Sequence, residues 1–227
     1  MYLSRLTLKR SPSADALGAL LNPDDDARRM NTHHRLIWTA FAGDPNATRT
    51  FLWREDGNGC FIVLSYEPPH TAELFEAPEI KPFAPDLRPD DRLAFRLRVN
   101  PTRTIKTGEP KANGKRARKH QDVVMQALHG VPKGERATAR MDLAQTATHD
   151  WLRAQGERHG FRVGECHMSS YRVLDLPGRR QRSPRFGIVD VDGVIELTQP
   201  EPFLERLKQG FGRAKAFGCG LMLIRRV

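Results

Sequence analysis

The chain has 227 residues, and its 37 Lys and Arg residues outnumber its 27 Asp and Glu residues, for a formal net charge of +10. Such an excess attracts a polyanion over much of the surface, so nucleic acid or an anionic membrane is the expected partner. A membrane partner requires an apolar run of about 18 residues or a strongly amphipathic basic helix. The sequence offers neither, which favours nucleic acid.

The first residues and the cysteines predict a cytoplasmic protein. Residues 1–8 lack the apolar core of a signal peptide and alternate like a strand. Cys60, Cys166 and Cys219 are widely separated and odd in number, which argues against a disulfide framework. Because there is no CxxC pair and no evident carboxylate cluster, we expect neither a metal nor another cofactor.

The first half of the chain predicts strand, helix, strand, strand, short helix and strand. The expected strands cover residues 2–9, 51–54, 60–66 and 80–83. The first helix ends at Phe41, with Leu36, Ile37 and Ala40 on its apolar face. A short helix is expected over residues 72–75. Gly57 and Gly59 favour a tight hairpin between the second and third strands.

The second half repeats this order after a segment rich in Pro and Asp. We expect strands at residues 92–99, 161–173, 186–197 and 221–224, a helix that begins near residue 138 and ends around 156–160, and another over 202–208. The sequence therefore predicts an α+β protein of two tandem ferredoxin-like domains, the arrangement also used by RNA-recognition domains. The expected domains are residues 1–84 and 92–227, joined by a linker over 85–91.

Basic residues gather on several segments of the second half. In the strand at 92–99, apolar residues alternate with Arg96 and Arg98, which predicts one core face and one cationic face. Residues 103–119 are strongly basic, and Gly108, Pro110 and Gly114 predict that they lack regular structure. The candidate RNA-binding residues in this loop are Arg103, Lys106, Lys115, Arg116, Arg118 and Lys119, and a further cluster holds Arg179, Arg180 and Arg182. Such loops suit a phosphate backbone better than base edges. A basic loop that is only solvated can have the same composition.

Residues 210–220 form a glycine-rich stretch before the last strand. It lacks the Lys followed by Ser or Thr of a P-loop, and it leads into a strand, which excludes a dinucleotide fingerprint. Bare backbone and two cations could still bind phosphate, although a flexible turn explains the glycines equally well. The candidate residues are Gly210, Gly212, Arg213, Lys215, Gly218 and Gly220.

Several segments resemble the type I-E CRISPR repeat endoribonucleases, the CasE subunits of Cascade complexes. They are residues 1–5 (MYLSR), 95–101 (FRLRVNP), 151–152 (WL) and, most specifically, 209–221 (QGFGRAKAFGCGL). The resemblance spans nearly the whole chain in the right order. It implies a metal-independent endoribonuclease that binds the hairpin of CRISPR repeat RNA and cuts at the hairpin base by attack of the 2′-hydroxyl. It also implies a 2′,3′-cyclic phosphate product, retention of the guide RNA, docking on Cascade backbone subunits, and a monomer when free.

The resemblance assigns the active-site histidine to His34, because the family places it just before an apolar helix face. An imidazole can exchange a proton with the ribose near neutral pH. Neighbouring His33 could be mistaken for it. Some members have a tyrosine three residues earlier, where this chain has Asn31, so His34 could act as base, acid or both. Arg35 could stabilise charge on the scissile phosphate, or pair with an aspartate at 24–26.

Two other classes of function compete with this reading. A non-catalytic protein of the same fold could hold a structured RNA without cutting it. Aromatic residues make up 7% of the chain, which favours recognition of backbone and shape over base stacking. A metal-dependent nuclease would need a carboxylate cluster, and none stands out.

Overall fold

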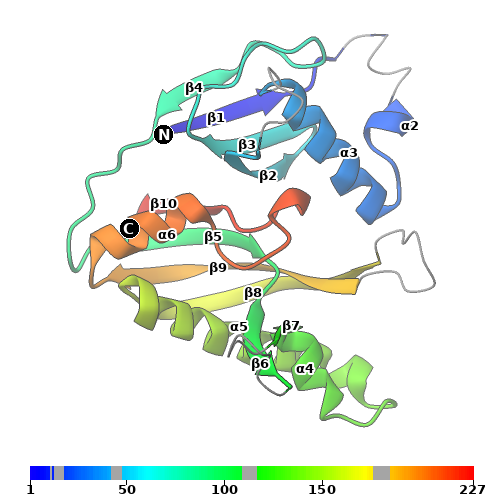
Figure 1. The fold of residues 1–227 in the computed structure, drawn as a ribbon, viewed down its shortest axis with the longest axis vertical. Helices are drawn as coiled ribbons and strands as arrows, with labels where there is room; N and C mark the ends of the chain where they lie inside the picture. Colours follow the sequence, from blue (N-terminus) through cyan, green and yellow to red (C-terminus); the bar gives the residue numbers. More distant parts are fainter. Residues whose placement is uncertain (11, 13–17, 42–47, 109–116, 176–184) are drawn as a thin grey trace.

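The computed structural model describes residues 1–10, 12, 18–41, 48–108, 117–175 and 185–227. The described strands form two four-stranded antiparallel sheets and one two-stranded hairpin (Figure 1). In this part of the chain, no helix is both long and apolar enough to cross a membrane.

The first sheet has the strand order β2-β3-β1-β4, built from β1 (Tyr2–Thr7), β2 (Phe51–Gly57), β3 (Cys60–Ser65) and β4 (Glu79–Pro82). The short helix α2 (Gly18–Leu21) precedes α3 (Asp26–Thr39), which packs on one face of this sheet through Leu36 and Ile37. The sequence prediction of a strand, a helix and two further strands is confirmed here.

The helix predicted at residues 72–75 is wrong. The chain makes a single turn in which the Phe75 amide donates to the Ala72 carbonyl (3.0 Å). Phe75 then forms an isolated antiparallel bridge with Leu8 and is 1% exposed. A segment this short gains little from helix formation by itself, since nucleation fixes several dihedral angles for one hydrogen bond, so tertiary contacts decide its conformation. Extended pairing with Leu8 buries the phenyl ring instead.

The second sheet has the order β10-β5-β9-β8, from β5 (Arg92–Val99), β8 (Phe161–Asp175), β9 (Arg185–Leu197) and β10 (Met222–Arg226). Helix α5 (Arg136–His159) packs on β8, and α6 (Pro200–Gln209) contacts α5. In each sheet the first strand lies between the third and the fourth, which is the ferredoxin-like arrangement. The predicted pair of ferredoxin-like folds is confirmed.

The basic residues 103–119 were predicted to lack regular structure, and this is wrong for the described part. Strands β6 (Thr102–Thr107) and β7 (Ala117–Asp122) pair as a hairpin, with Lys106 opposite Arg118. Pro110 and Gly114 belong to residues 109–116, which lie outside the described residues. The sequence reasoning also missed helix α4 (Val123–His129), which is capped by the Asp122 carboxylate.

The two halves share apolar contacts. Met30 of α3 packs with Leu174, Ile188 and Cys219, and Leu52 of β2 belongs to a second shared cluster. Helix α3 also contacts η1 (Lys215–Phe217) in the glycine-rich segment, and Figure 1 shows that segment beneath α3. The fold therefore brings the predicted histidine helix and the predicted glycine-rich segment together.

Candidate nucleic-acid interface

Helix α3 presents two adjacent histidines in different environments. The Asp25 side chain caps the helix by accepting from the Arg28 amide at 2.7 Å. Ala27, Met30 and Ile37 lie on the buried stripe. Since successive residues are about 100° apart around a helix, His33 falls on this stripe and His34 beside it.

His33 is a core residue. Its side chain is 2% exposed, and its ring lies edge-on to Phe61 with centroids 4.9 Å apart. Burial lowers its pKa, while Glu55, whose Oε2 is 3.7 Å from Nδ1, partly offsets that effect. His33 therefore has no open path to a substrate, which leaves His34 as the accessible histidine of the pair.

His34 is half-buried and bonded to the indole of Trp38 one turn along the helix. The Trp38 Nε1–H donates to His34 Nε2 at 3.1 Å, and the His34 ring has no other hydrogen-bond partner among the described residues. An indole can only donate, so Nε2 carries the lone pair and a neutral ring has its proton on Nδ1. Phe51 supports the indole edge-on at a centroid distance of 5.2 Å.

Two arginines act electrostatically on this imidazole, and one of them also acts on Lys215. The pKa of His34 is lowered first by burial and then by the charges of Arg49 and Arg35. Arg49, which precedes β2, is itself half-buried, and burial lowers its pKa. The pKa of Lys215 is lowered by burial, by Arg206 and by Arg49. The imidazole is thus held neutral at neutral pH beside positive charges that suit a phosphate.

Arg35 is exposed and makes no ion pair with a described residue, so the alternative pairing with an aspartate at 24–26 is wrong. Asp26 pairs instead with Arg29 and, at 3.9 Å, with Arg172. Asp25 is engaged in capping the helix. Arg35 therefore remains available to an anion beside His34.

The glycines of residues 210–220 are required for close packing. The sequence analysis considered phosphate binding or a flexible turn and did not consider this role. A Cβ on Gly212 would lie 2.4 Å from the Asn100 carbonyl oxygen, and one on Gly218 would lie 3.2 Å from the Trp53 ring. Both residues have positive φ, of 66° and 69°. These glycines let the segment approach β2 and β5, with Arg213 paired to Asn100 and the η1 turn, which carries Lys215, against α3.

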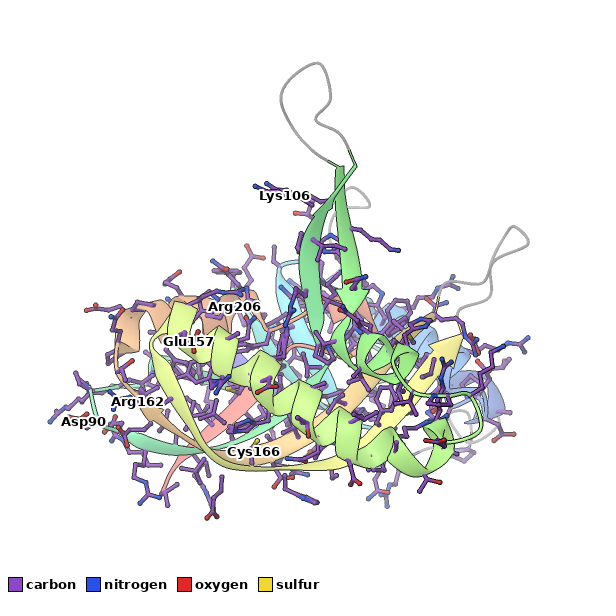
Figure 2. The ribbon with its side chains drawn as sticks, turned by 90° about the horizontal axis from the view of Figure 1, so that it is seen from below. Asp90, Lys106, Glu157, Arg162, Cys166 and Arg206 are labelled. Atoms are coloured by element: carbon purple, nitrogen blue, oxygen red, sulfur yellow. The ribbon has the colours of Figure 1, made fainter. Side chains whose placement is uncertain are left out.

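The hairpin carries its cations on both faces. Because paired residues share a face and faces alternate, Lys106 and Arg118 project on one side and Arg103 and Lys119 on the other. All four are exposed, and Figure 2 shows the hairpin standing out from the body of the protein with Lys106 along it. The predicted residues Lys115, Arg116, Arg179, Arg180 and Arg182 lie outside the described residues.

The cationic face predicted for β5 is largely neutralised by β9. Arg98 donates to the Asp190 carboxylate through Nε at 2.7 Å and through Nη2 at 3.3 Å, and it is 16% exposed. Arg96 is exposed and lies opposite Asp192 in the strand register. No local pattern predicts these pairings, since the two aspartates come from a strand about 90 residues away.

Sequence reasoning missed Trp38 and Arg49 as parts of this site. The spacing of four residues between His34 and Trp38 places both on one helix face, so the sequence alone could have predicted that Trp38 belongs to the site. Arg49 gave no comparable signal, because only the packing of β2 beside α3 brings it to the histidine. Among the described residues, no group of three or more His, Cys, Asp or Glu could hold a metal ion.

This fold and site define a class: a protein of two ferredoxin-like units with a cationic surface around a neutral histidine. Residues 1–226 match the model of the family described as CRISPR associated protein, and the chain belongs to that family. The chain is 25% identical to the CRISPR system Cascade subunit CasE of Escherichia coli over 98% of each protein. It is 27% identical to the CRISPR-associated endoribonuclease Cse3 of Thermus thermophilus, over 63% of this chain and 60% of that protein.

The fold also matches solved structures of CRISPR-associated proteins. The fold matches Cse3 bound to a 19-nucleotide RNA with a TM-score of 0.64 and 25% identity, covering 99% of this chain and 100% of that one. It matches Cas6e of E. coli with a TM-score of 0.63 and 22% identity, each chain being covered in full.

Proposed function

We propose that this protein is a CasE-type endoribonuclease that binds the hairpin of CRISPR repeat RNA and cleaves the precursor at the hairpin base. The observation that carries the proposal is the neutral, accessible His34 beside Arg35 and Arg49, in a chain that aligns end to end with CasE. The relatives named as an endoribonuclease and as a Cascade subunit support catalysis and assembly into a Cascade complex. Retention of the guide RNA, docking on the backbone subunits and a cytoplasmic location complete the proposal.

The reaction needs no metal in this scheme. The ribose 2′-oxygen attacks the adjacent phosphorus, the bond to the 5′-oxygen breaks, and a 2′,3′-cyclic phosphate remains on the upstream fragment. His34 accepts the 2′-hydroxyl proton at Nε2, the nitrogen with the lone pair, after the substrate hydroxyl replaces the Trp38 indole. The departing 5′-oxygen takes up a proton from water, and the hydroxide that this leaves takes the proton held by His34, which restores the neutral imidazole.

The surrounding cations stabilise the transition state and hold the RNA. Arg35 and Arg49 lie where charge builds on the phosphate oxygens, a preorganised electrostatic contribution. The hairpin cations contact the phosphate backbone of the duplex, and Arg213 and Lys215 contact the strand near the cut. Arg96 stays a prediction, whereas Arg98 acts by orienting Asp190 and β9 rather than by offering a free charge.

Replacing His34 tests the catalytic part of the proposal. His34→Ala should slow single-turnover cleavage of a cognate repeat by about 10²- to 10⁴-fold, the usual worth of a general base, with hairpin affinity nearly unchanged. His70→Ala is the matched control, since His70 is an exposed histidine of the same half. His33→Ala should reduce the cleavage rate less than His34→Ala.

Two further measurements separate cleavage chemistry from binding alone. The wild-type protein should cut in EDTA, and a repeat with a 2′-deoxy residue just upstream of the scissile bond should bind without being cut. An unchanged rate in His34→Ala would exclude His34. Failure of the wild-type protein to cut any cognate repeat would support the alternative of a non-catalytic RNA-binding protein.

A further inference from the structure

A concave site lies in the C-terminal half, lined by residues that follow β5 in the chain. It is a cavity of about 450 Å³ bounded by β6 and β7, the last turns of α5, α6 and the glycine-rich segment. Its described lining includes Arg103, Arg158, Arg206 and Arg213, with His120 and His159, and holds no carboxylate. Figure 2 shows Arg206 beside α5, near the foot of the hairpin. A cavity with this lining suits an anion.

Arg206 is the arginine of this cavity that has a buried hydrogen-bond donor without a partner among the described residues. Its guanidinium lies over the Phe211 ring, 5.3 Å from the centroid, and its buried Nε has no hydrogen-bond partner among the described residues. Burial and the nearby Arg158 lower its pKa, and burial and these two arginines lower the pKa of His159. A buried donor without a partner costs free energy that a bound phosphate oxygen would recover.

The cavity is linked by charge to the histidine site. Arg213 lines it, and Lys215, two residues further along, donates from Nζ to the Gln209 carbonyl at 2.5 Å. The charges of Arg206 and Arg49 both lower the pKa of Lys215, and the charge of Arg49 also lowers the pKa of His34. Electrostatic interactions between neighbouring groups therefore connect His34 to the cavity through Arg49, Lys215 and Arg206.

We propose that this cavity, the arginine pocket, binds a backbone phosphate of the single-stranded RNA that continues from the scissile bond beyond the hairpin. The inference rests on the proposed function, because it takes the strand at His34 as its starting point. Trp151 lines the pocket but is 5% exposed and donates its indole N–H to the Thr102 carbonyl, so it offers no stacking face to a base. The contact is with the backbone and is therefore independent of the flanking sequence.

The test compares two uncleavable RNAs, each with a 2′-deoxy residue at the scissile position. One ends at the base of the hairpin, and the other carries a single-stranded extension. With Arg158→Gln/Arg206→Gln, the Kd for the extended RNA should rise about tenfold, since charge-assisted contacts to one phosphate are lost. The slope of log Kd against log salt should fall by about 0.7, the value for one phosphate of a single strand. The Kd for the short hairpin should not change.

Arg153→Gln is the matched control, because Arg153 is an exposed arginine of α5 that pairs with Asp150 at 3.7 Å outside the pocket. Since Arg206 packs on Phe211, the single variant Arg158→Gln provides the same comparison if the double variant does not fold. Equal weakening of both RNAs would overturn the proposal, as would equal effects of Arg153→Gln and Arg158→Gln.

A further arm separates an RNA phosphate from a free anion. If 10 mM inorganic phosphate at constant ionic strength removes the preference of the wild-type protein for the extended RNA, the pocket is a site for small anions and the proposal fails. Because neither RNA can be cut, the outcome is independent of whether His34 is catalytic. A failure of the pocket is therefore distinguishable from a failure of the proposed function.

Discussion

Removal of the Trp38 indole N–H should raise the pKa of His34. The bond from Nε1 to His34 Nε2, at 3.1 Å, stabilises only the neutral imidazole, because a protonated Nε2 cannot accept it. A protein hydrogen bond is worth about 1 kcal/mol net, and one pKa unit corresponds to about 1.4 kcal/mol. Trp38→Phe should therefore raise the pKa of His34 by about 0.7 unit while keeping an aromatic ring against Phe51.

The shift can be measured by NMR titration of the His34 ring and by the pH dependence of single-turnover cleavage. The ascending limb assigned to His34 should move to higher pH by the same amount. Trp53→Phe is the matched control, since Trp53 is a buried tryptophan whose Nε1 has no hydrogen-bond partner among the described residues. It lies 6.5 Å from the ring of His33.

An unchanged or lower pKa in Trp38→Phe would refute the reasoning, because burial and the charges of Arg49 and Arg35 would then account for the lowered pKa of His34. A similar rise in Trp53→Phe would assign the shift to general loosening of the first half. Thermal unfolding of both variants separates such loosening from the local effect.

Three other outcomes follow from the same geometry. Arg49→Gln should slow cleavage more than it weakens hairpin binding, which single-turnover kinetics and a binding titration would show together; an unaltered rate would remove Arg49 from the site. Joint neutralisation of the basic hairpin should weaken RNA binding and flatten its salt dependence more than it changes the saturating rate, and an unchanged salt slope would place the footprint elsewhere. The residues to change are Lys115, Arg116, Arg118 and Lys119. The lowered pKa of His33 means that the unfolded chain binds more protons below pH 6.5, so the free energy of unfolding should fall as pH drops from 6.5 to the folded pKa. Chemical denaturation across this range should show the fall, and it should be smaller in His33→Gln.

Much of the fold was readable from local patterns. Alternation in residues 92–99 identified β5 with the bounds observed, and helical spacing identified α3 and α5. Such patterns succeed because each strand or helix must bury one face, which leaves its period in the sequence. The short helix at 72–75 failed because pairing with Leu8, far along the chain, decided its conformation.

The sequence by itself determined the positive charge, the strand and helix order, and the identity of the histidine helix, since each depends on composition or on neighbouring residues. Only the tertiary structure decided which cations are available. Arg98 is engaged by Asp190 from a distant strand, whereas Arg49, Lys215 and Arg206 come from three separate segments and are brought together without carboxylate partners among the described residues. Long-range contacts of this kind depend on how sheets and helices pack, and a linear pattern carries no record of them.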